Sequence, residues 1–331
     1  MTDNDATARY GITIPFDNVA LGAQREWIEE LPDLGYTDVW SSEANGADAF
    51  TPLTLASVWA PSLRLGTAIV PTFTRGPACL AQSVGSIAQA AEGRFVLGLG
   101  TSSDVIVERW NGIEFVEPYR KTRDMVRFLR TALTGEKVTE TYDTFAVRGF
   151  KLGVVPEQPV PILVAALREG MLRLAGREGD GAIINWLSAD DVATVAPVVR
   201  QFGPGPDGRE KEIVARIFVA PSEDADMVRN LGRYAIAAYL NVPVYAAFHE
   251  WLGRGPQLAD MWRLWKEGDR KAALAAISDD VVDQLIVHGS AQQCRAHIQR
   301  YVDNGVTTPA LAVLAFPGID QRQAIRDLAL R

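Results

Sequence analysis

The chain has 331 residues, of which 47% are hydrophobic and 22% are charged. This composition is too apolar for an intrinsically disordered protein, and the length suffices for a core that needs no disulfide or metal. The 33 basic and 41 acidic residues give a net charge of −8, which argues against a nucleic-acid-binding protein. No apolar run approaches the roughly 18 residues of a membrane span, and the polar N-terminus lacks the apolar centre of a secretory signal.

Cysteine and histidine are scarce. Cys79 and Cys294 are far apart and have no zinc-binding spacing, which we interpret as a reduced, cytoplasmic protein without a metal site. His249, His288 and His297 all lie in the last quarter of the chain, so the residues before them cannot supply a histidine triad. Chemistry in the N-terminal half must therefore depend on carboxylates, hydroxyls, backbone groups or a cofactor.

In chain order, short β-branched runs alternate with amphipathic stretches. The runs predict strands at residues 9–16, 38–42, 64–70, 95–100, 162–165, 181–185, 213–220 and 309–314. Helices are predicted at residues 21–34, 50–60, 77–91, 119–133, 170–175, 190–201, 290–304 and 320–330. A hairpin is predicted at residues 138–147, and the stretch from 224 to about 286 is predicted to be helical throughout.

Repeated βα units indicate a parallel sheet. This number of units predicts a (β/α)₈ TIM barrel, a single α/β domain over residues 1–331 with a helical insertion at about 224–286. A doubly wound open sheet is the alternative. In a barrel the active site lies at the carboxyl ends of the strands, which are positions 16–17, 42–43, 69–71, 100–104, 165–168, 185–186 and 221.

Two of these strand ends are rich in small residues. Residues 98–104 (GLGTSSD) offer hydroxyls and free amides to an anion or a ring carbonyl, although Ser103 stands where a dinucleotide fingerprint has its third glycine. A glycine-rich turn without a ligand is equally consistent with the spacing. Residues 65–74 end a strand at Pro71, and the small residues 66–68 would let a planar ligand approach. An ordinary strand with a proline stop is favoured by the pattern alone.

Charged residues at other strand ends are weaker candidates. Glu43 could bond a ring N–H or shuttle a proton, but most glutamates are solvated surface groups, and the same holds for Asp17 and Asp104. Arg168 precedes a predicted helix, and its charge together with free helix amides suits a phosphate. The alternative for Arg168 is a surface ion pair with Glu169 or Glu178. Aromatic residues of the insertion could line an apolar pocket or a subunit interface, and core packing is the commoner role at this spacing.

Three segments together carry a resemblance: LGTAIVPTFTRGPACLAQ, GRFVLGLGTSSDVIVERWNG and PVPILVAALREGMLRLAGREGDGAIINWLS. The chain resembles the bacterial-luciferase-like superfamily, within it the branch that uses the deazaflavin coenzyme F420 rather than FMN. The resemblance covers nearly the whole chain, from Tyr10 to about Pro317. It implies a (β/α)₈ barrel with insertions, and it implies a homodimer.

The resemblance also implies roles for residues at the strand ends. It implies a non-prolyl cis peptide bond between Ala68 and Ile69, placed against the back face of the deazaflavin. The turn after the fourth strand would contact the coenzyme ring or its ribityl chain through Thr101, Ser102 and Ser103. The loop after the fifth strand would hold the phosphate through Ala166, Leu167, Arg168, Gly170 and Met171. Substrate contacts are expected from the other strand ends, at Phe16, Asn185 and Trp186.

Two departures from the family pattern bear on the reaction. Sugar-phosphate dehydrogenases of the superfamily have an Asp-His pair where this chain has Glu43 and Ala44, and a glutamate where it has Ser103. We therefore expect a reductase that delivers hydride to an activated C=C, C=N or C=O, with Glu43 or Asp104 as the proton source. A monooxygenase using reduced FMN and O₂ is the alternative, and a barrel without catalysis is a third reading. Because of the acidic charge we expect a neutral, partly apolar small-molecule substrate, and neither nucleic acid nor membrane as a partner.

Overall fold

The computed structural model describes residues 9–205 and 208–330. Its parallel strands close into a barrel in which β9 pairs with β10 and β12 pairs with β1, so the open sheet considered from the sequence is excluded. In order around the barrel the strands are β1 (Gly11–Thr13), β2 (Asp38–Ser41), β3 (Arg64–Thr67), β5 (Phe95–Gly100), β8 (Ile162–Ala165), β9 (Gly181–Asn185), β10 (Glu212–Ala220) and β12 (Thr308–Val313). The predicted TIM barrel is confirmed.

Helices cover the outside of the barrel in the alternation expected from the sequence. They are α1 (Arg25–Glu30), α2 (Phe50–Trp59), α3 (Pro77–Ala90), α4 (Pro118–Ala132), α5 (Glu169–Glu178), α6 (Val192–Arg200), α12 (Ala291–Asp303) and α13 (Gln321–Asp327). The predicted hairpin is present as β6 (Val138–Thr141) and β7 (Ala146–Phe150). Within the described residues no helix is long and apolar enough to cross a membrane.

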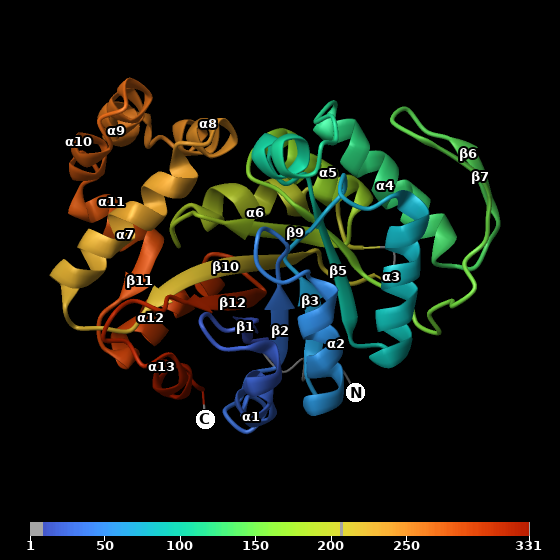
Figure 1. The fold of residues 1–331 in the computed structure, drawn as a ribbon, viewed down its shortest axis with the longest axis horizontal. Helices are drawn as coiled ribbons and strands as arrows, with labels where there is room; N and C mark the ends of the chain where they lie inside the picture. Colours follow the sequence, from blue (N-terminus) through green and yellow to red (C-terminus); the bar gives the residue numbers. More distant parts are fainter. Residues whose placement is uncertain (1–8, 206–207, 331) are drawn as a thin grey trace.

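The insertion is built from several short helices. It consists of α7 (Ala225–Leu240), α8 (Pro243–Trp251), α9 (Gly255–Glu267), α10 (Arg270–Ala275) and α11 (Asp279–Leu285). It ends in a strand that the sequence did not predict, β11 (Ile286–His288), which pairs with the last residues of β10. In Figure 1 the insertion lies on the left and rises beside the end of the barrel toward which the β2 arrow points, opposite the β6–β7 hairpin. The insertion thus borders the carboxyl ends of the strands.

Two predicted strands differ from the structure, and one helical element was not predicted. The first strand is limited to Gly11–Thr13 because Pro15, which is cis after Ile14, has no N–H to continue pairing. The predicted strand at 64–70 is divided into β3 and β4 (Val70–Pro71) by a cis bond between Ala68 and Ile69, as the resemblance implied. A π-helix at Val105–Trp110 fills part of the segment for which no element was predicted.

Strand alternation separates the two sides of the barrel wall. Side chains of Trp40, Val96, Leu163, Ile183, Val214 and Ala310 form the interior cluster. Residues between them along the strands join the larger core under the helices. Trp40 can fill the lower interior because its neighbours Gly11 and Gly66 have no side chain, since a Cβ on Gly66 would lie 2.2 Å from the Trp40 ring. The base of the lumen is therefore closed by packing.

The first residues of several strands form an ion-pair network below this packing. Arg64 binds Glu212 through two hydrogen bonds of 2.7 and 2.6 Å and Asp38 through one of 3.1 Å. The Thr308 hydroxyl donates to Glu212 at 2.7 Å. Burial raises the pKa of Glu212, but Arg64 offsets this and leaves the pKa below its usual range. The base of the barrel is thus both packed and electrostatically paired.

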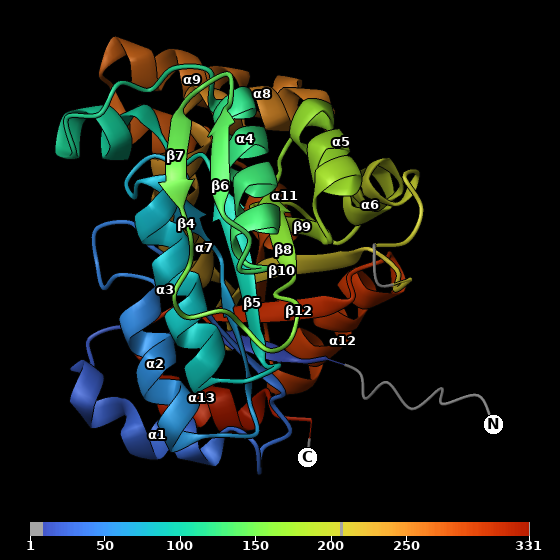
Figure 2. The ribbon, with the colours of Figure 1, turned by 90° about the vertical axis from the view of Figure 1, so that its right-hand side faces the viewer.

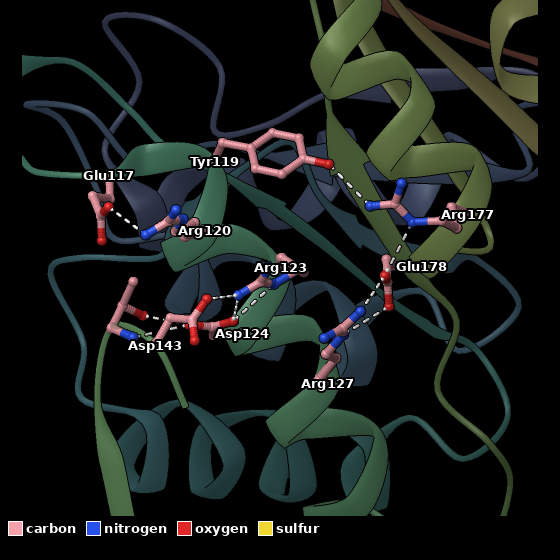
Figure 3. Close-up of polar contacts among 10 residues, drawn as sticks. Glu117, Tyr119, Arg120, Arg123, Asp124, Arg127, Asp143, Arg177 and Glu178 are labelled. Carbon is pink, nitrogen blue, oxygen red and sulfur yellow. Dashed lines mark hydrogen bonds and ion pairs between the residues drawn. The ribbon is translucent and has the colours of Figure 1, made fainter. Parts of the chain in front are cut away.

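A second network ties the hairpin and α5 to α4 on the outer surface (Figures 2 and 3). Arg123 on α4 bonds Asp143 in the hairpin turn at 2.6 Å, and its neighbour Asp124 accepts the Thr144 backbone N–H at 3.0 Å. Arg127 bonds Glu178, the last residue of α5, at 2.7 Å. These contacts fix the position of α5, whose first turn lies at the mouth of the barrel.

Candidate functional site at the barrel mouth

A partly exposed apolar floor lies where β3, β5 and β8 end. Ala68, Ile69 and Ala165 are partly exposed and pack against the interior cluster. Ile69 can lie there because Gly100 lacks a side chain: a Cβ on Gly100 would lie 2.8 Å from Ile69 Cγ1 and 3.0 Å from Ala165 Cβ. The Ile69 carbonyl accepts the Glu43 backbone N–H at 3.1 Å, which holds this bend against the end of β2. The floor suits the face of a flat ring.

The turn after β5 lies beside this floor. Thr101, Ser102 and Ser103 are all partly exposed, and Ser102 adopts a positive φ of 62°. The Thr101 hydroxyl donates to the Ser102 carbonyl at 3.2 Å. Asp104 follows at the start of the π-helix, where it lies 3.6 Å from Arg109 and is 44% exposed. The structure therefore brings the predicted coenzyme-contacting hydroxyls to the mouth and places Asp104 at its solvent-facing edge.

The loop after β8 presents an arginine without a partner. Arg168 precedes α5 and is exposed, and its guanidinium forms no hydrogen bond or ion pair within the described residues. The acidic residues considered as its surface partners are engaged elsewhere, Glu169 with Arg173 and Glu178 with Arg127 and Arg177. The ion-pair alternative for Arg168 is thus wrong.

The start of α5 is open as well as basic. No side chain caps the helix, and a Cβ added to Gly170 would meet nothing within 4 Å. Ala166 is buried, with its N–H donated to Ile183, whereas Leu167 and Met171 pack partly on the core. Free amides at a helix start together with a nearby cation make a binding site for an anion such as phosphate.

Glu43 is held in an ion pair. Both of its carboxylate oxygens lie 2.6 Å from Arg75 Nη1, and Oε2 accepts the Ala49 backbone N–H at 3.2 Å. Arg75 also lies 5.1 Å from the Phe50 ring centre. The side chain of Glu43 is only 16% exposed. The second-strand carboxylate therefore lies close to the floor, with its charge neutralised by its neighbour.

The three expected substrate contacts separate into two groups. Asn185 faces the lumen and its amide donates to the Tyr245 hydroxyl at 3.2 Å. Trp186 is buried, stacks on Phe218 with ring centres 4.0 Å apart, and leaves its Nε1 without a partner. Phe16 instead packs against Trp27 in the layer beneath the helices, with ring centres 5.2 Å apart, and the structure does not bring it into the lumen.

One lumen residue was not found from the sequence. Arg216 lies on the inward face of β10, between Val214 of the interior cluster and Phe218. A signal was present, since a single arginine interrupts the otherwise apolar run IVARIFVA. In a strand buried on both faces a charged residue is unusual. Tyr239 and Tyr245 of the insertion were noted only as members of an aromatic group, and the structure places them beside Trp186 and Asn185.

A metal site was not expected, and the described residues contain no group of three or more His, Cys, Asp or Glu side chains placed to hold a metal ion. The exposed floor, the hydroxyl-rich turn and the anion site at α5 lie on adjacent strands, β3 to β8. A ligand with a flat ring and a phosphate-bearing tail fits this arrangement. The residues present thus fit a flavin-like or deazaflavin-like coenzyme.

Known proteins resemble the chain over most of its length. It is 28% identical over 280 residues to a 5,10-methylenetetrahydromethanopterin reductase of Methanolobus tindarius, covering 82% of this chain and 84% of the relative. It is 28% identical over 341 residues to an F420-dependent glucose-6-phosphate dehydrogenase of Kineococcus radiotolerans, covering 97% and 95%.

Solved structures share the fold. The coenzyme F420 dependent tetrahydromethanopterin reductase of Methanopyrus kandleri superimposes with a TM-score of 0.80, at 19% identity and 97% coverage of both chains. An F420-dependent secondary alcohol dehydrogenase superimposes with a TM-score of 0.76, at 17% identity and 98% coverage of both. The family model described as luciferase-like monooxygenase matches residues 3–308. The chain therefore belongs to the luciferase-like monooxygenase family.

Proposed function

We propose that this protein is an F420-dependent oxidoreductase that acts as a reductase of an activated C=C, C=N or C=O in a small organic molecule. The observation that carries the proposal is the partly exposed floor of Ala68, Ile69 and Ala165, bordered on the same side by the hydroxyl turn and the basic start of α5. The relatives that are named as F420-dependent enzymes support the coenzyme. When bound in its reduced form, F420 would supply a hydride from the C5 carbon of its deazaflavin ring and would thereby become oxidised.

Different residues of the mouth would hold different parts of the coenzyme. Ile69 and Ala165 would support one face of the ring, and the hydroxyls of Thr101, Ser102 and Ser103 would bond its polar edge or its ribityl chain. Arg168 and the free amides of α5 would bind the phosphate. This leaves the opposite face of the ring toward the lumen, where a substrate carbon can be held close enough for hydride transfer.

A proton must complete the reduction, and we assign the role of proton donor to a carboxylate at the mouth. Glu43 lies against the floor but is paired with Arg75. Asp104 is closer to solvent and can exchange protons with water. Both residues are therefore candidate acids, and the two are separable by substitution.

Binding titration tests the coenzyme. Fluorescence titration of one protein sample with F420 and with FMN should give a micromolar or tighter Kd for F420 and at least about tenfold weaker binding of FMN, equivalent to about 1.4 kcal/mol. Tighter binding of FMN would replace the reductase with the flavin monooxygenase. Binding of neither would overturn both.

The finer expectations on assembly and location remain predictions. A homodimer should appear in sedimentation velocity as a single species of twice the 36.1 kDa chain mass. A cytoplasmic protein should keep Cys79, which is exposed on α3, as a free thiol in the cell. Thiol alkylation before and after reduction measures this directly.

A further inference from the structure

Arg216 is a cation in the barrel lumen that nothing in the described residues neutralises. Its guanidinium forms no hydrogen bond or ion pair there, and the Nε atom is inaccessible to solvent. Burial lowers the pKa of Arg216, but a guanidinium remains charged at neutral pH. The Asp17 carboxylate acts electrostatically on Arg216, but Asp17 is exposed and forms no ion pair with the guanidinium.

The groups around Arg216 form a receptor with one polar and one aromatic side. Asn185 is its register neighbour on β9, and the Asn185 amide bonds the Tyr245 hydroxyl. On β12 the register neighbour is Ala310, which has only a methyl side chain. The Phe218 ring centre lies 5.1 Å from Arg216 Cζ, and Trp186 stacks on the Phe218 ring.

The strand order places this receptor across the lumen from the floor. Going around the barrel from β3, which ends at the floor, the strands are β5, β8 and β9 in one direction and β2, β1 and β12 in the other. Both routes reach β10 after three intervening strands. Arg216 is therefore diametrically opposite the bend at Ile69, and a molecule held by Arg216 would face the open side of a ring lying on the floor.

We infer that Arg216, with the amide of Asn185 and the hydroxyl of Tyr245, is the substrate-recognition site and that it takes a carboxylate-bearing acceptor. The inference rests on the proposed function, which it extends by naming the substrate class. It departs from the neutral substrate expected from the net charge, because a local cation outweighs a distributed charge of −8 at contact distance. A guanidinium binds a carboxylate through two parallel hydrogen bonds, and Phe218 and Trp186 form an apolar wall beside it.

Direct binding of matched probes tests this without turnover. Calorimetric titration of the purified protein with cinnamate and with cinnamamide, and with benzoate and benzamide, compares a carboxylate with its neutral amide. We expect each carboxylate to bind at least about tenfold more tightly than its amide. The same titrations with F420 bound should keep this preference.

Three variants assign the preference to Arg216. Arg216→Met should reduce carboxylate affinity to that of the amide, whereas Arg216→Lys should retain part of the preference through its charge. Arg263→Met removes an equal charge from the exposed face of α9, where Arg263 pairs with Asp260 and Glu267. This variant should leave the carboxylate preference unchanged. Circular dichroism confirms that each variant is folded.

The outcomes separate the inference from the proposed function. Equal binding of carboxylates and amides by the native protein, or a preference that survives in Arg216→Met, would overturn the inference. Both results can occur while F420 still binds, in which case the reductase stands with a different substrate class. If F420 fails to bind while the carboxylate preference disappears in Arg216→Met, the recognition site stands and the coenzyme proposal falls.

Discussion

The two ends of the barrel differ in how their charged residues are paired. At the base, Arg64 is surrounded by Asp38 and Glu212, and every one of these charges has a partner. At the mouth, Arg216 and Arg168 have none in the described part of the chain, and the Trp186 Nε1 is buried without an acceptor. A buried unpaired polar group costs stability, so groups left in this state are candidates for binding something else. The base stabilises the barrel, and the mouth is arranged to bind ligands.

The largest effect on stability should come from removing an ion pair at the base of the barrel. Glu212→Gln leaves the Arg64 guanidinium without its main partner and should lower the free energy of unfolding by about 3–5 kcal/mol. Urea denaturation measures this. The matched surface change Glu117→Gln removes only an exposed pair with Arg120 and should cost less than about 1 kcal/mol. Equal costs for the two variants would show that the base is no more than a surface network.

The pH dependence of stability should separate the two ends. Near the mouth, burial and then Arg254 lower the pKa of His249 to about 4, so the unfolded chain takes up a proton first as the pH falls below 6.5. Stability present above pH 6.5 should therefore decline by up to about 3 kcal/mol toward pH 4. The lowered pKa of Glu212 adds a second loss only below about pH 4.5.

A variant isolates the first of these pH windows. His249→Leu places an apolar side chain that does not titrate in the buried position. It should flatten the loss of stability between pH 6.5 and 4 and leave the loss below pH 4.5 in place. Thermal denaturation across this range measures both. A loss between pH 6.5 and 4 that persists in His249→Leu would contradict the assignment.

Two variants of one ion pair test the proposed proton relay. If Glu43 supplies the proton, Glu43→Gln should lower kcat by about 100-fold. Arg75→Met should preserve most of kcat, because it leaves the carboxylate in place. Steady-state kinetics in H₂O and D₂O, with Asp104→Asn as the third variant, measures the effect. Equal losses in Glu43→Gln and Arg75→Met would make Glu43 a residue that only positions the loop.

Removal of the Arg168 charge at the start of α5 should weaken binding of the phosphate-bearing tail of the coenzyme. Arg168→Met should raise the Kd of F420 about tenfold, equivalent to about 1.4 kcal/mol, and should reduce the salt dependence of binding. Arg173→Met, one turn further along the same helix, removes a charge already paired with Glu169 and is the control. An unchanged Kd in Arg168→Met would place the phosphate elsewhere.

The smallest effect on stability should come from the mouth itself. Arg216→Met replaces an unpaired cation with an apolar side chain, so the Tm should remain unchanged or rise slightly, by the equivalent of at most about 1 kcal/mol. Differential scanning calorimetry without ligand measures this. A loss comparable to that of Glu212→Gln would mean that Arg216 is a structural residue and would end the contrast between the two ends.

The sequence predicted the parts of the fold that depend on continuous patterns. The strands at residues 95–100, 162–165 and 181–185 have the predicted bounds, because each is an apolar run with a clear stop. The strand at Ile286–His288 was missed because it follows α11 without an intervening turn. Its pairing with β10 is a long-range contact that no local pattern encodes.

The site was predictable to a different degree at each residue. Ala68, Ile69 and the hydroxyl turn were located by their place at strand ends, and the structure brings them together. Phe16 was nominated by the same rule, but it lies with Ile12 and Ile14 in the core layer under the helices. Arg216 lies within a strand rather than at its end, so the rule did not reach it; strand alternation in the folded barrel shows which face it occupies.

A crystal structure of the protein with F420 and cinnamate tests the contrast most directly. The account predicts electron density for the ring on Ile69 and Ala165, with the probe carboxylate on Arg216 across the lumen. Density that pairs Arg216 with the coenzyme, or that places the ring away from Ile69, would contradict it.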